Sequence, residues 1–105
     1  MGKVSVVFAQ PSSHDIAEKV EIKDKVEMMA STPEFHAGCE ADGHARKQLE
    51  AIAKALAFCH NRAKAYIGGY EFNRGTFEFP AGNDISMLVH YEARATIYVT
   101  GQRVF

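Results

Sequence analysis

Side chains of the kind that bind transition metals are grouped in two short segments of this sequence. They are His36, Cys39 and His44 in the segment HAGCEADGH, and Cys59 and His60 further along the chain. Zinc is held by about four N or S donors, and a short loop that supplies several of them is typical of small sites. His14 is a further candidate donor. A zinc-binding module is therefore one hypothesis. The alternative, which we favour, is a polar loop without metal or cofactor, with Cys59 as a small apolar side chain of the core.

Two further groupings contain residue types that are used in catalysis. Cys59 and His60 are a nucleophile and a base by type, but neighbours on a helix point about 100° apart, which prevents the hydrogen bond they need. His90, Glu92 and Arg94 alternate along a predicted strand, so a base, a carboxylate and a cation share one face. A sheet that is open to water on that face offers no closed pocket. We therefore interpret the row as solvated surface and predict that the protein is not an enzyme.

The segment 44–66 is the clearest predicted element. It is rich in Ala, Leu, Lys and Arg, follows Asp42 as a helix cap, and ends before two glycines. Its apolar stripe consists of Ala45, Leu49, Ile52, Leu56, Cys59, Ala63 and Ile67. This stripe predicts a helix of roughly six turns that covers one face of a sheet. The preceding segment, 31–43, is predicted to be a loop from its composition.

Alternating apolar residues predict strands on both sides of this helix. The segments 3–9 and 85–99 alternate throughout. The segment 12–30 fits both a helix and a strand; we favour a strand over 18–29, preceded by a short helical turn, although Asp24 breaks the alternation. One apolar and one polar face is typical of an antiparallel sheet that is covered on one side. The expected fold class is α+β: a single antiparallel sheet of four to five strands, covered on one face by one long helix.

The segment YEFNRGTFEF is predicted to form a hairpin over 70–79 that turns at Arg74-Gly75. In this register Glu71 lies directly across from Glu78. Like charges in opposite positions repel each other. Two interpretations are open: the two carboxylates face water at little cost, or they lie ready for a cationic partner surface.

The composition limits the class of protein. A chain of 105 residues fits one domain, 1–105. Twelve basic and thirteen acidic residues give a net charge of −1, without the basic surplus of a dedicated nucleic-acid binder. No apolar run is long enough to span a membrane, so we expect no membrane partner. Two cysteines make no disulfide framework, which favours a reducing, cytoplasmic location.

The predicted helix 44–66 carries a basic surface. Its basic residues are Arg46, Lys47, Lys54, Arg62 and Lys64, against Glu50 alone. Cations spaced along a helix can follow a phosphate backbone, so a nucleic-acid-binding protein is the second hypothesis. Ala51, Ala55 and Phe58 interrupt this surface where base-reading side chains would be needed, which counts against it.

Two surfaces are predicted to bind a partner. On the helix they comprise Ala51, Ala55, Phe58 and Arg62, and on the polar sheet face Glu71, Glu78, Glu92 and Arg94. A large apolar side chain beside small ones suits docking of another helix or a second copy. The alternative is that the loop 31–43 or the segment 12–30 covers Phe58 within the same chain. The sheet face is predicted to be acidic and the helix basic, a pairing that permits self-association.

The first hypothesis is therefore a small, non-enzymatic interaction protein that self-associates. Its size and lack of catalytic motifs suit an accessory, inhibitory or assembly subunit of the kind that phages and mobile elements encode. A nucleic-acid-binding protein and a zinc-binding module are the alternatives.

Overall fold

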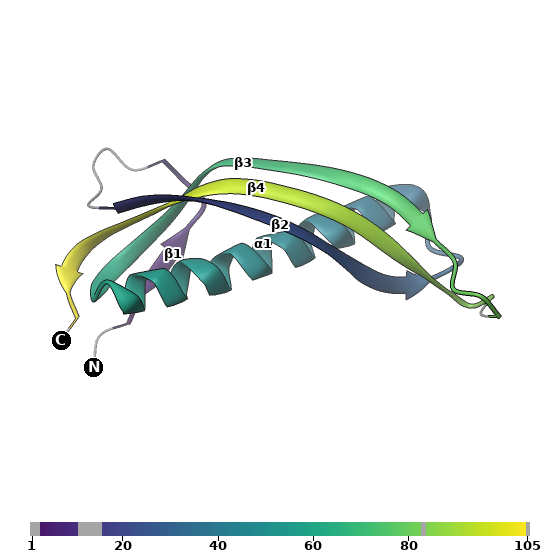
Figure 1. Ribbon diagram of the computed structural model, residues 1–105, viewed down its shortest axis with the longest axis horizontal. Coiled ribbons are helices and arrows are strands. Elements are labelled where there is room, and N and C mark those ends of the chain that lie inside the picture. The colour runs from purple at the N-terminus through teal and green to yellow at the C-terminus, as the bar shows by residue number, and fades with distance from the viewer. Residues whose placement is uncertain (1–2, 11–15, 83, 105) are drawn as a thin grey trace.

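The computed structural model describes residues 3–10, 16–82 and 84–104, which form four strands and one helix (Figure 1). In chain order the elements are β1 (Ser5–Val7), β2 (Ile16–Met29), α1 (Glu34–Cys59), β3 (Arg62–Glu78) and β4 (Ser86–Arg103). The long strands arch over the helix, which lies along their concave side (Figure 1). The predicted α+β class, with one long helix on one face of a single sheet, is confirmed.

The sheet has the strand order β1-β3-β4-β2. Strands β2 and β3 both pair antiparallel with β4, whereas β1 pairs parallel with β3. The sheet is thus mixed, and the prediction of a purely antiparallel sheet is wrong in this detail. Parallel neighbours need a long crossover connection, and here β2 and α1 together provide it between β1 and β3.

Helix α1 begins at Glu34, inside the segment predicted to be a loop, and ends at Cys59 rather than at 66. Pro33 precedes it and Glu34 lies in its first turn, and both favour a helix start. The buried residues recur at every fourth position: Ala37, Ala41, Ala45, Leu49, Ala53 and Ala57. Rows at this spacing run obliquely to the helix axis. The buried row, here called the alanine ridge, therefore winds gradually around the helix axis and follows the curve of the arched strands.

The end of the helix also differs from the prediction. Asn61 has a φ of 56°, a left-handed conformation that Asn adopts more readily than most residues and that stops a helix. The chain then enters β3, so Ala63 and Ile67 lie on a strand and not on the helical stripe. Cys59, predicted to be in the core, is exposed.

The predicted hairpin over 70–79 is wrong, because β3 runs straight through it and pairs with β4 along its length. The register shifts between Arg74 and Phe77, which marks a β-bulge in place of a turn. A Cβ atom on Gly75 would lie 3.0 Å from the carbonyl oxygen of His90, so a residue without a side chain allows the two strands to approach here. The Arg-Gly pair therefore marks a bulge.

The other predicted strands are confirmed. The alternation over 18–29 belongs to β2, and the alternation over 85–99 belongs to β4, whose inward side chains from Met87 to Val99 are all buried. Ile85 precedes β4 and is exposed. The short helical turn predicted before β2 falls on residues outside the described ranges, as does His14.

The core consists of two clusters along the helix. One surrounds Ala41 and Val89, and the other surrounds Leu49 and Ile97. The described residues extend over 52 × 26 × 17 Å, an elongated shape that follows the helix. In the described part of the chain, no helix is long and apolar enough to cross a membrane.

Candidate interaction surfaces

The outer side of α1 carries the apolar surface that the sequence predicts. Phe58 is 63% exposed, and Ala55 and Ala51 are exposed one and two turns before it, respectively. The prediction that Phe58 lies outside the core is thus confirmed.

A groove runs between this side of the helix and the N-terminal segment that contains β1. It consists of two hollows, with volumes of about 730 and 430 Å³, that share Val4 and Lys54. The lining residues are Lys3, Val4, Val6, Lys47, Glu50, Ala51, Lys54, Ala55, Phe58 and Cys59. We call this the α1–β1 groove. Its walls combine apolar side chains from both elements with three lysines and one glutamate.

The basic helix surface is smaller than predicted. Arg62 and Lys64 lie on β3, because the helix ends at Cys59. The guanidinium of Arg46 lies 4.9 Å from the ring centre of Phe8 and 4.5 Å from that of Tyr70. Its Nε also donates to Asp42 Oδ2 at 3.2 Å. Arg46 therefore joins the helix to the sheet near β1, and Lys47 and Lys54 alone remain of the predicted phosphate-binding row.

Glu71 and Glu78 on the outer sheet face each pair with a side chain of the same chain. Glu71 lies across from Arg94, with 3.5 Å between Oε2 and Nη2. Glu78 Oε2 lies 2.7 Å from His90 Nε2. The predicted juxtaposition of Glu71 and Glu78 is wrong, because it required the hairpin. Both residues remain exposed on this face.

The same face is not predominantly acidic, contrary to expectation. Strand β2 adds Lys19, Lys23 and Lys25 to it, on the side opposite its inward residues. Lys23 Nζ lies 3.8 Å from Glu92 and 3.7 Å from Glu21. Exposed pairs of this kind contribute little to stability. The face is a mixed, locally neutralised surface.

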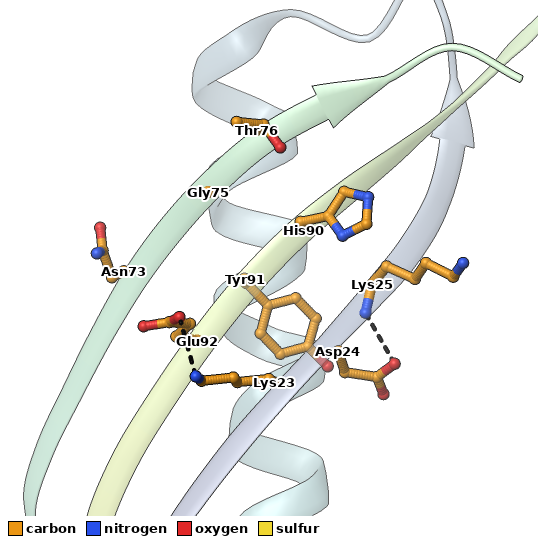
Figure 2. A pocket seen from close by; sticks show the side chains of 9 residues that line it. All are labelled: Lys23, Asp24, Lys25, Asn73, Gly75, Thr76, His90, Tyr91 and Glu92. Atoms are coloured by element: carbon orange, nitrogen blue, oxygen red, sulfur yellow. Dashed lines mark hydrogen bonds and ion pairs between the residues drawn. The ribbon is translucent and has the colours of Figure 1, made fainter.

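A shallow hollow of about 570 Å³ lies on the outer sheet face between Lys23, Asn73, Thr76 and His90 (Figure 2). It contains a base, a carboxylate and an ammonium group, the residue types that suggested catalysis. The His90 ring is held by Glu78, and Glu92 is engaged with Lys23. The hollow is open, and Figure 2 shows that its lining side chains come from β2, β3 and β4.

A chain of hydrogen bonds crosses the interface between helix and sheet toward β2. Gln48 Nε2 donates to Asp24 Oδ2 at 2.7 Å, which leaves Gln48 Oε1 to accept from the hydroxyl of Tyr91. Since the single Tyr91 proton is used in this way, His44 Nδ1, 2.6 Å from the Tyr91 oxygen, is the donor to it. The hydrogen bonds therefore all run in one direction: His44 donates to Tyr91, Tyr91 donates to Gln48, and Gln48 donates to Asp24.

The electrostatics follow from these contacts. The pKa of Asp24 is lowered, first by the hydrogen bond from the backbone N–H of Lys25 and then by Gln48. Burial raises the pKa of Tyr91 to about 12, and the charge of Asp24 adds to the shift. Burial also raises the pKa of Tyr70, whose hydroxyl donates to Asp42. Tyr91 lies on the apolar side of the alternating segment 85–99, so the sequence pattern predicts it only as a core residue. The one signal for this network in the sequence is the break that Asp24 makes in the alternation of β2.

The candidate metal ligands are not brought together. His36 and Cys39 lie on the first turns of α1, and His44 is bound to Tyr91. Cys59 is about 30 Å from Cys39 at roughly 1.5 Å of rise per residue. Within the described ranges, no group of three or more His, Cys, Asp and Glu side chains is placed to hold a metal ion. Cys39 and Cys59 are both free thiols.

Comparisons with known protein families, with curated proteins and with solved structures found no match. The geometry of these surfaces is therefore the basis of the proposed function.

Proposed function

We propose that this protein is a non-enzymatic interaction protein whose α1–β1 groove binds an acidic, amphipathic segment of a partner protein. The observation that supports the proposal is the combination of apolar walls and lysines in the groove. Phe58 is 63% exposed beside Ala51 and Ala55, and Val4 lies on the opposite wall. Apolar side chains held in a concave surface provide the central contacts of most protein interfaces.

The charges favour an acidic occupant. Lys3, Lys47 and Lys54 line the groove against Glu50. Complementary charges around an apolar centre speed association and select the partner. A segment that offers one large apolar side chain to the space above Ala51 and Ala55, with Asp or Glu on either side, fits both features.

The proposal also includes a second contact surface, a location and a class of subunit, all three predicted from the sequence. The outer-face residues Glu71, Glu78, Glu92 and Arg94 form a second contact surface, and Arg62 extends the helix surface. The protein acts in the cytoplasm, where the free thiols of Cys39 and Cys59 suit a reducing environment. Its size suits an accessory, inhibitory or assembly subunit encoded by a phage or mobile element.

The test uses two synthetic amphipathic peptides with identical leucines, one flanked by Glu and the other by Lys, and fluorescence anisotropy to measure binding. We expect the Glu peptide to bind and its affinity to fall as salt rises. Phe58→Asp should weaken binding by roughly 30-fold, the effect of losing about 2 kcal/mol at a central contact. Lys54→Glu should reduce the preference for the Glu peptide.

Phe35→Asp is the matched control, because Phe35 is 78% exposed on the same helix but outside the groove. It should leave binding unchanged. Equal binding of both peptides, or equal losses in the two Phe variants, would contradict the proposal. Sedimentation without peptide gives a further outcome: a dimer that Phe58→Asp abolishes would make a second copy the occupant and would also contradict the acidic segment.

A further inference from the structure

Strand β2 forms the outer edge of the sheet beside β4, and no strand in the described part of the chain lies beyond it. Two contacts show which of its backbone groups face outward. Ala30 N donates to Ile85 O at 2.9 Å, so even-numbered positions face β4. The carbonyl of His90, which lies across from Lys25, faces β3, where a Cβ on Gly75 would come within 3.0 Å of it. The backbone N–H and C=O groups of odd-numbered residues in β2 therefore face the open edge.

One of these outward groups is already used within the chain. The backbone N–H of Lys25 donates to Asp24 Oδ1 at 2.8 Å (Figure 2). The other oxygen of the same carboxylate accepts from Gln48 on α1. A strand that approached the edge would have to displace this hydrogen bond. An apolar side chain of such a strand would also lie against the Asp24 carboxylate. Inward-pointing charges are a known means of keeping sheet edges unpaired.

The rest of β2 is complementary to a second copy of itself. In an antiparallel pair centred on Lys23, residue numbers directly opposite each other sum to 46. On the outer face Lys19 meets Glu27 and Glu21 meets Lys25. Both are favourable opposite-charge pairs. Lys23 lies on the axis against its own copy, where Glu21 and Glu92 of each chain lie close to it.

On the inner face the same register forms one apolar pair near its centre, while Glu18 near the end of the strand meets Met28. Val20 meets Val26 of the other copy, and both are only partly buried in the single chain. Ile22 meets Asp24. Of the two pairs that place a carboxylate against an apolar side chain, this one lies next to the centre of the register, where such a contact is costly without full hydration. Asp24 therefore opposes the pairing through both its charge and its hydrogen bond to Lys25.

We propose that β2 is a self-pairing edge that the Asp24 side chain holds closed through its hydrogen bond from the N–H of Lys25, and that removal of this hydrogen bond lets two copies join antiparallel in the register centred on Lys23. The occupant is a second copy of this chain, because the outer-face charges of β2, and Val20 and Val26 on its inner face, are complementary across the axis at Lys23. This association uses the edge opposite the α1–β1 groove and does not depend on the function proposed for the groove.

The experiment compares Asp24→Val with Asp24→Asn in a background of Cys39→Ser and Cys59→Ser. Asn retains a side-chain oxygen that accepts from the N–H of Lys25, whereas Val does not and would pair with Ile22 of the other copy. Light scattering should show dimers for Asp24→Val at concentrations at least about tenfold lower than for the parent. Asp24→Asn should remain closed. If Asp24→Val fails to fold by circular dichroism, Asp24→Ala, which also lacks a side-chain acceptor, replaces it.

Two readouts identify the interface. Lys23→Cys, added to Asp24→Val, should form an intermolecular disulfide, since facing residues of a hydrogen-bonded pair have Cα atoms about 5.5 Å apart. Glu21→Lys and Lys25→Glu, each added singly to Asp24→Val, place like charges opposite each other and should weaken the dimer. A mixture of these two chains restores both pairs, so heterodimers should form, as native mass spectrometry can measure.

A monomeric Asp24→Val protein would overturn the proposal, as would a dimer without the Lys23→Cys disulfide or without preferred heterodimers. A parent protein already paired through β2 at neutral pH would show that Asp24 does not close the edge. Dimerisation of Asp24→Asn as strong as that of Asp24→Val would also overturn the proposal, because the hydrogen bond to Lys25 would then not be the closing contact.

Discussion

The two edges of the sheet are built in opposite ways. The β1 edge has three residues and is fixed by side chains, with Arg46 between Phe8 and Tyr70. The β2 edge has 14 residues paired with β4. The short edge is too small to cover the helix and leaves an apolar groove. The long edge covers its side of the helix but exposes backbone groups, and charges protect these.

Edge length alone therefore does not determine where a sheet is open to a partner. The β1 side is open through its side chains, and an occupant needs apolar contact. The β2 side is open through its backbone, and an occupant needs a free N–H at Lys25. Each side therefore selects a different kind of contact.

The alanine ridge packs against the sheet between its two edges. A cavity in the ridge should therefore destabilise the β1 edge and the β2 edge alike. Leu49 is its only large member and is fully buried. Leu49→Ala should destabilise the protein by about 2–5 kcal/mol, because it removes apolar contacts and leaves a cavity. Urea unfolding measures the loss, and hydrogen exchange should rise at both edges. The control is Ala51→Ser on the exposed side of the helix. A loss below about 0.5 kcal/mol, the usual range for surface changes, would contradict the described packing.

Arg46 should distinguish the edges, because its contacts lie on the β1 side. Arg46→Ala should cost about 1–2 kcal/mol, from two ring contacts and one ion pair. Hydrogen exchange should increase in β1 and remain unchanged in β2. Arg94→Ala, which removes only an exposed pair with Glu71, is the matched control and should change neither edge. Equal effects on β1 and β2 would show that Arg46 does not fix the short edge.

Alkaline pH should weaken the β2 side through Tyr91. Burial raises the pKa of Tyr91 to about 12, above the unfolded value of 10.0. The contribution of neutral Tyr91 is therefore complete below pH 10 and is lost as pH rises from 10 toward 12. Tyr91→Phe should cost about 1 kcal/mol at neutral pH, from its hydrogen bonds, and should reduce the loss of stability in that alkaline range.

Chemical unfolding at several pH values measures this effect, with Tyr98→Phe on the outer face as control. The alkaline loss that remains in Tyr91→Phe is assigned to Tyr70 on the β1 side, whose pKa is also raised by burial. An unchanged pH dependence in Tyr91→Phe would show that Tyr91 does not couple stability to alkaline pH.

The smallest effect is expected on the outer face, which belongs to neither edge. Glu71→Lys with Glu78→Lys should change stability by less than about 0.5 kcal/mol per site, because both pairs are exposed. If this face is the second contact surface, the same change should weaken partner binding most at low salt. A large loss of stability would show that the pairs with Arg94 and His90 hold the strands together.

The residue pattern predicted one long helix, a strand over 85–99 and, although a helix fitted as well, a strand over 18–29, and it placed Phe58 outside the apolar stripe of the helix. Strict alternation specifies which face of a strand is buried, since the side chains of a strand have a period of two. The outward position of Ala51, Ala55 and Phe58 follows in the same way from helical periodicity, wherever the helix begins.

The bounds of the helix, the course of β3 and the contacts of Asp24 could not be predicted from the sequence, because they depend on tertiary packing. The alanine ridge begins at Ala37 in a polar, glycine-containing segment, where composition indicates a loop and burial against the sheet prevails. The Arg74-Gly75 pair has the residues of a turn, but pairing with β4 continues past it as a bulge. The role of Asp24 depends on Gln48 and Tyr91, which only packing of the helix on the sheet brings to it. Local preferences amount to fractions of a kcal/mol per residue, whereas burial of the shared core contributes far more, so the core decides.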